Sequence, residues 1–280
     1  MEQTTKQIAK DSKSSFYYAF SLLPSDKREA MNNIYAFCRK TDDIIDEGLE
    51  TEEVKFEKLR KWRNELNKSL NGTSEYLILN KLSATIKKFN IPLEPFFDLI
   101  TGVETDLQQN RFSNFNDLKK YCYNVASTVG LMSIPIFGYK NESTKQYAIY
   151  LGMALQLTNI LRDVKTDADN GRIYLPKEDM EKFNYSENEL INHVYNTNFV
   201  SLMRFEAKRA EEFFGLADKY LNKSDKATLY PARAMQHIYH RLLHKLEAKN
   251  FNVFEKEIKV SKFDKVAIAL GVWLKYSLVY

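Results

Sequence analysis

Polar side chains recur at helical spacing in one stretch of the sequence, between residues 151 and 176. If this stretch is a helix at about 100° per residue, positions i, i+3, i+7 and i+11 fall on one narrow stripe. The stripe then carries two amides and two carboxylates: Gln156, Asn159, Asp163 and Asp167. Apolar residues flank it on both sides, so we expect it to line a cavity. The alternative is a solvated helix face that carries surface acids.

The chemistry of such a stripe depends on its charge. Two carboxylates in a partly apolar cavity repel each other by roughly 4 kcal/mol when about 4 Å apart at an effective dielectric constant of about 20. Carboxylate and amide oxygens are hard ligands that suit Mg²⁺, which usually keeps waters and binds through a few carboxylates together with substrate phosphates. We therefore predict that several Mg²⁺ ions act as the cofactor here.

A second acidic stripe lies closer to the N-terminus. Its members share one helix face at i, i+4, i+7 and i+11 and are Tyr35, Arg39, Asp42 and Asp46. Two helices that each present an Asp-x-x-x-Asp pair can hold metal ions between them, and Arg39 would add a rigid fork for phosphate oxygens. A surface ion pair between Arg39 and Asp42 would explain this helix alone, but not both stripes.

The elements that must position these stripes are helices. Nine glycines and six prolines are too few for a many-stranded protein, and both Asn-Gly pairs follow helical patterns instead of joining alternating strands. We predict an all-α fold, with helices over residues 26–47, 51–70, 75–89, 93–109, 115–137, 143–169, 199–222, 227–249 and 262–277. No repeat or flexible linker interrupts residues 1–280, which indicates a single domain.

Composition restricts the classes of partner and compartment. The 41 Lys and Arg residues nearly balance the 37 Asp and Glu residues, which argues against a nucleic-acid partner. Cys38 and Cys122 lie in apolar helical patterns and indicate reduced thiols of a cytoplasmic protein. Residues 1–6 lack the apolar stretch of a signal peptide, so we do not expect secretion. The last apolar run, residues 266–280, is shorter than the about 20 residues of a spanning helix. With its basic flanks it could still lie on a membrane surface.

Three further groups each have an ordinary structural explanation. Ser12 to Ser15 precede an aromatic cluster and could donate hydrogen bonds to an anion, but such a run is more often a capped helix start. Small residues between Tyr121 and Gly130 would let another helix or a ligand approach closely. His237, His240 and His244 share zinc-like spacing, but no cysteine supplies a fourth ligand, so we interpret them as partly exposed helix histidines.

Taken together, these residues resemble a known family, the squalene and phytoene synthases, which join two prenyl diphosphates head to head. Residues 151–176 are similar to the second signature of the family, and Tyr121 to Gly130 are similar to the first. The positions that carry the second signature are Leu151, Gly152, Gln156, Asn159, Ile160, Arg162, Asp163, Asp167, Arg172, Tyr174 and Pro176. With the Asp42 to Asp46 segment included, the resemblance spans nearly the whole chain.

The resemblance implies the all-helical isoprenoid-synthase fold around a central active-site cavity, with Mg²⁺ bridging the acidic helices to substrate diphosphates. The implied metal ligands are Asp42, Asp46, Asn159, Asp163 and Asp167. Tyr121 stands where the family has an active-site tyrosine, and it would act in catalysis with Arg39 and the four aspartates. Contacts to diphosphate or to the carbocation region would come from Ser12, Lys13, Ser14, Ser15, Tyr35, Arg39, Gln156, Arg162, Tyr239 and Lys256.

The implied reaction begins with loss of diphosphate from one substrate. The double bond of a second prenyl chain then attacks, giving a cyclopropylcarbinyl diphosphate that ionises again and rearranges. The start of the chain and its C-terminal helix look most like bacterial C30 enzymes, which predicts two farnesyl diphosphates as substrates. The product is left open between presqualene diphosphate, squalene, dehydrosqualene and, from geranylgeranyl diphosphate, phytoene. NADPH use and the oligomeric state also stay open.

Three other classes of protein share part of this pattern. Asp42-Asp43-Ile44-Ile45-Asp46 also satisfies the Asp-Asp-x-x-Asp pattern of head-to-tail elongases and terpene cyclases. Elongases carry that pattern twice, whereas Asp163 follows Arg162, and the Asn/Ser/Glu triad of cyclases is not found. A non-catalytic scaffold relative would be expected to have lost metal ligands, and none of the expected acids is missing.

Overall fold

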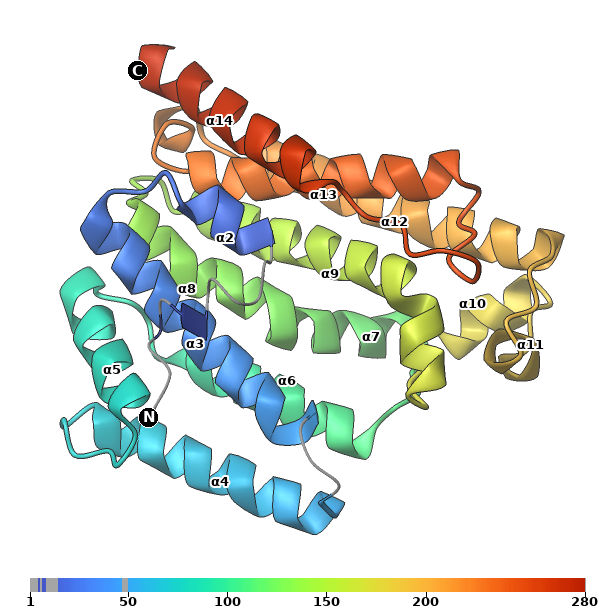
Figure 1. Cartoon of the computed structure of the whole chain (residues 1–280), viewed down its shortest axis with the longest axis horizontal. Coiled ribbons are helices and arrows are strands. Elements are labelled where there is room, and N and C mark those ends of the chain that lie inside the picture. The colour runs from blue at the N-terminus through green and yellow to red at the C-terminus, as the bar shows by residue number, and fades with distance from the viewer. Residues whose placement is uncertain (1–4, 6, 9–14, 47–49, 280) are drawn as a thin grey trace.

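The computed structural model describes residues 5, 7–8, 15–46 and 50–279, and in these residues every regular element is a helix (Figure 1). The predicted all-α fold is therefore confirmed. The helices are α2 (Ser15–Phe20), α3 (Ser25–Asp46), α4 (Glu52–Ser69), α5 (Leu77–Phe89), α6 (Glu94–Gln108), α7 (Phe115–Cys122), η1 (Tyr123–Ser127), α8 (Thr128–Phe137), α9 (Ser143–Asp169), α10 (Lys177–Lys182), α11 (Glu187–Ile191), α12 (Thr197–Tyr220), η2 (Lys223–Asp225), α13 (Tyr230–Ala248) and α14 (Lys262–Val279).

The ends of the predicted helices lie within about three residues of the observed ones. The prediction over residues 115–137 differs inside the helix, because the wider π-helical turn η1 separates α7 from α8. Short elements were missed: α10, α11 and η2 are too brief to show an apolar period. Both cysteines are free, with Cys122 buried and Cys38 half-buried.

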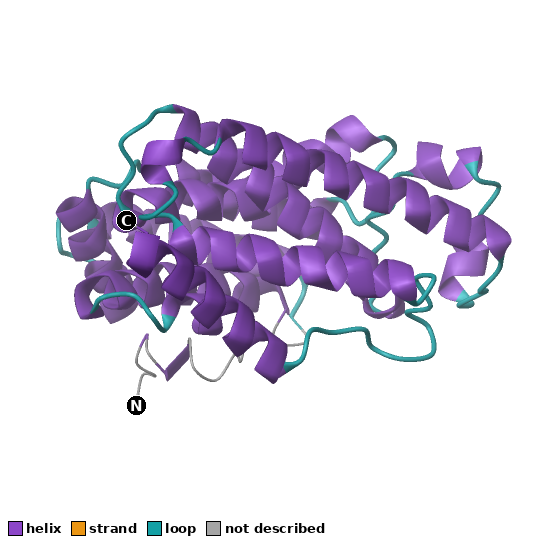
Figure 2. Cartoon of the chain, turned by 90° about the horizontal axis from the view of Figure 1, so that it is seen from above, coloured by secondary structure: helices purple, strands orange, loops and turns teal. Residues whose placement is uncertain are grey.

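The long helices run along the length of the molecule, as the views from the front and from above both show (Figures 1 and 2). Helix α9 lies at the centre, where α12 and α13 pack on it from one side and α8 and η1 from another. Helix α3 packs against α4, α5, α6 and α8. The buried apolar side chains of the described residues form one cluster, so the two acid-bearing helices, α3 and α9, share one core.

Two glycines bring α9 against the α8 side of the core. A Cβ atom on Gly152 would lie 2.6 Å from the Cα atom of Ser127 in η1, and one on Gly130 would lie 2.8 Å from the carbonyl oxygen of Ala148. Any larger residue would push these backbones apart. The small residues near Tyr121 thus serve close helix packing, one of the two uses expected of them.

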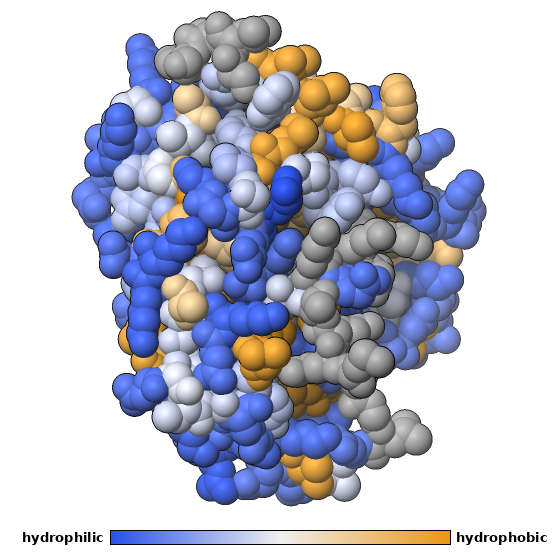
Figure 3. Space-filling model, turned by 60° about the vertical axis from the view of Figure 1, so that its left-hand side comes forward, coloured by the Kyte–Doolittle hydropathy of each residue, from blue (hydrophilic) through white to orange (hydrophobic). Residues whose placement is uncertain are grey.

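Helix α14 has two different faces. Ala269, Val272 and Tyr276 are buried, and the helix packs on α13 and α2. The opposite side exposes apolar residues: Phe263, Val266, Leu270 and Leu274. Figure 3 shows apolar surface gathered at the top of that view. None of the described helices combines the length and the hydrophobicity that crossing a membrane requires.

Candidate active site

A cavity of about 660 Å³ lies between α3, α9 and the α7 to α8 segment. Helices α2, α6, α13 and α14 also contribute to its wall. The predicted site residues that line it are Ser15, Tyr35, Arg39, Asp42, Asp46, Tyr121, Gln156, Asn159, Arg162, Asp163, Asp167 and Tyr239. Both stripes therefore face the same space, although more than a hundred residues separate them in the sequence.

Four other residues were predicted for the site. Ser12, Lys13 and Ser14 fall outside the described residues. Lys256 is exposed in the segment between α13 and α14 and is not among the residues that line the cavity, so its predicted contact with diphosphate is not supported. Lys265 of α14 lines the cavity instead, because α14 packs across α2 with this side chain turned inward. Burial and the nearby Arg162 lower the pKa of Lys265.

The two acidic stripes raise the pKa values of their own members. Burial raises the pKa of Asp42 to about 7, and the charge of Asp46 one turn away adds to the shift. Burial likewise raises the pKa of Asp167 to about 7, with a further contribution from Asp163. The repulsion expected from the sequence is thus present, and each stripe would be stabilised by a cation.

One amide oxygen of the site has no donor. The Nδ2 atom of Asn159 donates to Oε1 of Gln156 at 3.3 Å. The Oδ1 atom of Asn159 is buried and has no hydrogen-bond partner among the residues that the structure describes. Such an orphaned acceptor costs about 1–3 kcal/mol unless something positive approaches it. With the carboxylates of α3 and α9 it forms a set of oxygen donors that fits a hard divalent cation such as Mg²⁺.

Three arginines lie among the acids. Arg39 pairs with Asp43 (Nε to Oδ1, 2.8 Å) and not with Asp42, so the surface pair considered as the alternative does not form. Arg162 pairs with Asp163 (Nε to Oδ1, 2.7 Å).

Arg172, which follows the turn at Gly171, donates from Nη2 to Oδ1 of Asp46 at 3.1 Å. Arg172 belongs to the second signature of the family, but it was not among the predicted site residues. An isolated bridge between Arg111 and Ile173 fixes the segment that carries it.

Asp106 on α6 also lines the cavity and was missed. The hydroxyls of Tyr121 and Tyr174 donate to its two carboxylate oxygens at 2.8 and 2.9 Å, and the two phenol rings stack with centroids 5.3 Å apart. Burial raises the pKa of Asp106 to about 6, although both phenol donors oppose the shift. No second acid follows it at helical spacing, so the sequence contained no stripe that could have revealed it.

The opposite part of the cavity wall is aromatic and aliphatic. Phe20 of α2 is buried, with ring centroids 5.8 Å from Phe137 of α8 and 5.5 Å from Phe16. Ile34 and Met31 of α3 belong to the same wall. This surface offers no charge and no strong hydrogen-bond donor, so it suits a hydrocarbon chain and keeps water from a reactive cation.

Comparison with known proteins decides the family. A family model described as squalene/phytoene synthase matches residues 9–264. The chain belongs to the squalene/phytoene synthase family. It is 37% identical over 276 residues to the 15-cis-phytoene synthase of Synechococcus elongatus, covering 94% of this chain and 88% of that protein. It is 35% identical over 258 residues to phytoene synthase 2 of Solanum lycopersicum, covering 90% and 83%.

Solved structures place this squalene/phytoene synthase among the same group. The crystal structure of a dehydrosqualene synthase in complex with a ligand superposes with a TM-score of 0.85 at 32% identity, covering 99% of this chain and 96% of that one. A squalene synthase from Alicyclobacillus acidocaldarius superposes with a TM-score of 0.80 at 23% identity, which supports the fold. The all-α isoprenoid-synthase architecture implied by the sequence is thereby confirmed.

Proposed function

We propose that this protein condenses two prenyl diphosphates head to head (1′-1) in a magnesium-dependent reaction and releases diphosphate. The main observation that supports this proposal is that the acids of α3 and α9 face one cavity whose opposite wall is apolar. The first choice of substrate is farnesyl diphosphate, converted through presqualene diphosphate towards a C30 product, squalene or dehydrosqualene. We propose that the whole chain, residues 1–280, works as one domain, because its described core is continuous.

The metal would be held by oxygen atoms from both helices: Asp42, Asp46, Asn159, Asp163 and Asp167. When bound, Mg²⁺ would neutralise charge that develops on the departing diphosphate. The buried Oδ1 of Asn159, which has no donor, and the raised pKa values of Asp42 and Asp167 support this assignment.

The side chains themselves would carry out the rest. Arg39, Arg162 and Arg172 would exchange part of their pairing with aspartates for phosphate oxygens, which a guanidinium binds in a two-pronged fashion. The aromatic wall around Phe20 would hold the prenyl tail and exclude water while the allylic cation exists. Asp106 would keep the hydroxyls of Tyr121 and Tyr174 oriented next to the reacting carbons.

The second candidate is phytoene synthesis from two geranylgeranyl diphosphates. The curated relatives at 35–37% identity carry that name, whereas the superposed structure at 32% identity is a dehydrosqualene synthase. The aromatic closure by Phe20 and Phe137 favours the shorter chain. NADPH is needed only if the product is squalene.

The test is a product assay on purified protein. Farnesyl and geranylgeranyl diphosphate are each incubated with and without Mg²⁺ and NADPH, diphosphate release is measured, and products are identified by mass spectrometry. We expect Mg²⁺-dependent release and a C30 product from farnesyl diphosphate. A C40 product alone would establish the second candidate, and no release from either substrate would overturn both.

A further inference from the structure

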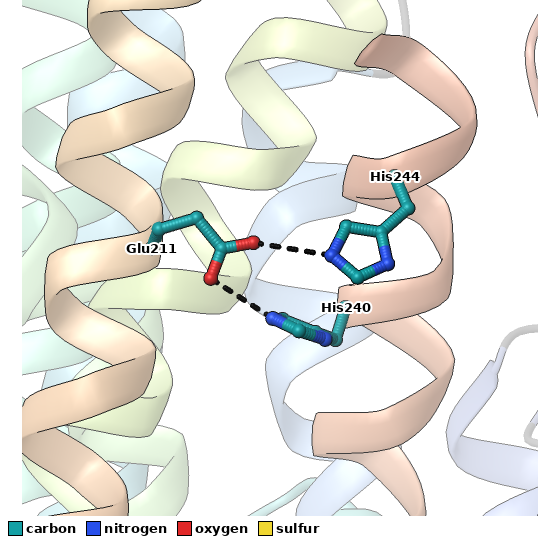
Figure 4. A group of neighbouring side chains, drawn as sticks. All are labelled: Glu211, His240 and His244. Carbon is teal, nitrogen blue, oxygen red and sulfur yellow. Dashed lines mark hydrogen bonds and ion pairs between the residues drawn. The ribbon is translucent and has the colours of Figure 1, made fainter. Parts of the chain in front are cut away.

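Two histidines and a glutamate converge away from the cavity. His240 and His244 lie one turn apart on α13, and Glu211 reaches them from α12 (Figure 4). The carboxylate oxygens of Glu211 lie 2.9 Å from Nε2 of His240 and 3.5 Å from Nε2 of His244. One ligand atom from each residue lies within 4.8 Å of the other two. His237, the third histidine with zinc-like spacing, is not part of this group.

These separations suit a metal ion at their centre. Zinc binds imidazole nitrogen and carboxylate oxygen at about 2.0–2.2 Å, so a tetrahedral site spaces its donor atoms about 3.4 Å apart. The two nitrogen-to-oxygen distances, 2.9 Å from His240 to Oε2 and 3.5 Å from His244 to Oε1 of Glu211, lie on either side of that spacing. Small side-chain rotations are enough to admit an ion, because His244 is exposed and the other two are only partly buried.

The donor types favour one class of metal. Neutral imidazole suits zinc and the neighbouring divalent transition metals, whereas Mg²⁺ prefers oxygen alone. Three protein ligands leave a fourth position for water. We propose that Glu211, His240 and His244 form a second metal site, selective for Zn²⁺ over Mg²⁺ and separate from the cavity.

The site would join two helices, of which only one lines the cavity. Helix α12 packs along α9, while the other side of α13 supplies Ala232, Met235 and Tyr239 to the cavity wall. Tyr239 directly precedes His240 in the sequence. An ion bound to Glu211 and both histidines would therefore fix the α13 wall relative to α12.

The test is Zn²⁺ binding to tag-free, metal-stripped protein in the presence of excess Mg²⁺, which competes for the acids of the cavity. Calorimetry or competition with a chromophoric chelator should show one Zn²⁺ per chain, with a dissociation constant in the micromolar range or tighter. Zn²⁺ should raise the melting temperature, and Co²⁺ should give the visible absorption of a low-coordinate site.

Variants locate the site. His244→Ala and Glu211→Gln should each weaken Zn²⁺ binding by at least about tenfold and remove the thermal shift, while circular dichroism confirms that they fold. His237→Ala is the matched control, on the same helix but outside the group, and should bind like the wild type. Equal Zn²⁺ affinity in wild type, His244→Ala and Glu211→Gln would overturn the proposal, as would wild-type binding weaker than millimolar. Neither result bears on prenyl condensation, which is assayed with Mg²⁺.

Discussion

The two ends of the cavity are built in different ways. The polar end draws all its acids but Asp106 from two helices, α3 and α9, each of which repeats them along one face. The apolar end is assembled from single side chains of several helices, among them Phe20 of α2, Ile34 of α3 and Phe137 of α8. The polar end therefore has a pattern within each helix, whereas the apolar end exists only in the folded protein.

This difference separates two aspects of function. If the chain acts as proposed, the polar end would decide whether diphosphate leaves. The apolar end can decide which prenyl chain fits, and it can change one side chain at a time. Substitutions at the two ends should accordingly produce different kinds of effect.

The largest effect is expected at the polar end. Asp42→Asn or Asp163→Asn keeps side-chain volume but removes a charged oxygen ligand, so turnover should fall by about 10²-fold or more. Asp169→Asn is the control on the same helix, because Asp169 pairs with His193 at the surface. Steady-state kinetics and thermal melts are the measurements. Near-normal turnover in either cavity variant, with an unchanged melt, would refute the metal assignment.

An intermediate effect is expected where Asp106 holds two phenols. Tyr121→Phe removes one hydroxyl that donates to Asp106 while keeping the ring stacked on Tyr174. The loss of one such hydrogen bond, about 1 kcal/mol, should lower turnover by roughly fivefold if it orients the reacting chain. Full activity in Tyr121→Phe would limit this residue to packing.

At the apolar end, we expect substitutions to change the length of the preferred prenyl chain and not the turnover rate. Phe20→Ala should open the wall towards Phe137 and raise the preference for geranylgeranyl over farnesyl diphosphate, at a stability cost of about 3–5 kcal/mol. Phe96→Ala is the matched control, since Phe96 is fully buried but does not line the cavity. A folded Phe20→Ala variant with the wild-type preference would show that Phe20 does not limit tunnel length.

The free energy of unfolding should depend on pH in a way that reveals the charge of the acids at the polar end. The pKa values of Asp42 and Asp167, about 7 in the fold, lie above the unfolded value of about 3.9. Keeping these acids charged therefore destabilises the metal-free protein, and this cost is complete above about pH 7. Mg²⁺ should raise the melting temperature more at about pH 8 than at about pH 6, and equal shifts would contradict the assignment.

The smallest effect concerns the outer face of α14. Its exposed apolar residues and basic neighbours predict weak, reversible binding to anionic vesicles, while its inner face packs like a core helix. Truncating residues 266–280 would therefore damage the core. Phe263→Ser with Leu270→Ser tests the surface alone, with flotation on vesicles as the measurement. Unchanged flotation in this folded double variant would remove the membrane role.

The sequence predicted the polar end well because its residues repeat at the helical period. Asp106 and Phe20 show why the rest was harder. Asp106 gains its role from Tyr121 and Tyr174, which lie 15 and 68 positions away, and no spacing rule connects them. Phe20 and Phe137 pack together from α2 and α8, more than a hundred positions apart, so no pattern within one helix could predict this wall. Glu211 lies 29 positions before His240, on a different helix, so no spacing within α13 could add it to the histidines.

The contact between Gly152 and Ser127 has a consequence for how this protein can evolve. Because the α9 and η1 backbones already touch there, the scaffold cannot widen at this point without rebuilding its core. In the proposed reaction, product size would then be varied by trimming or enlarging side chains that project into the space. Under the proposed function, single-codon changes in the cavity wall would be enough to alter the length of the isoprenoid, with the acids of α3 and α9 left as they are.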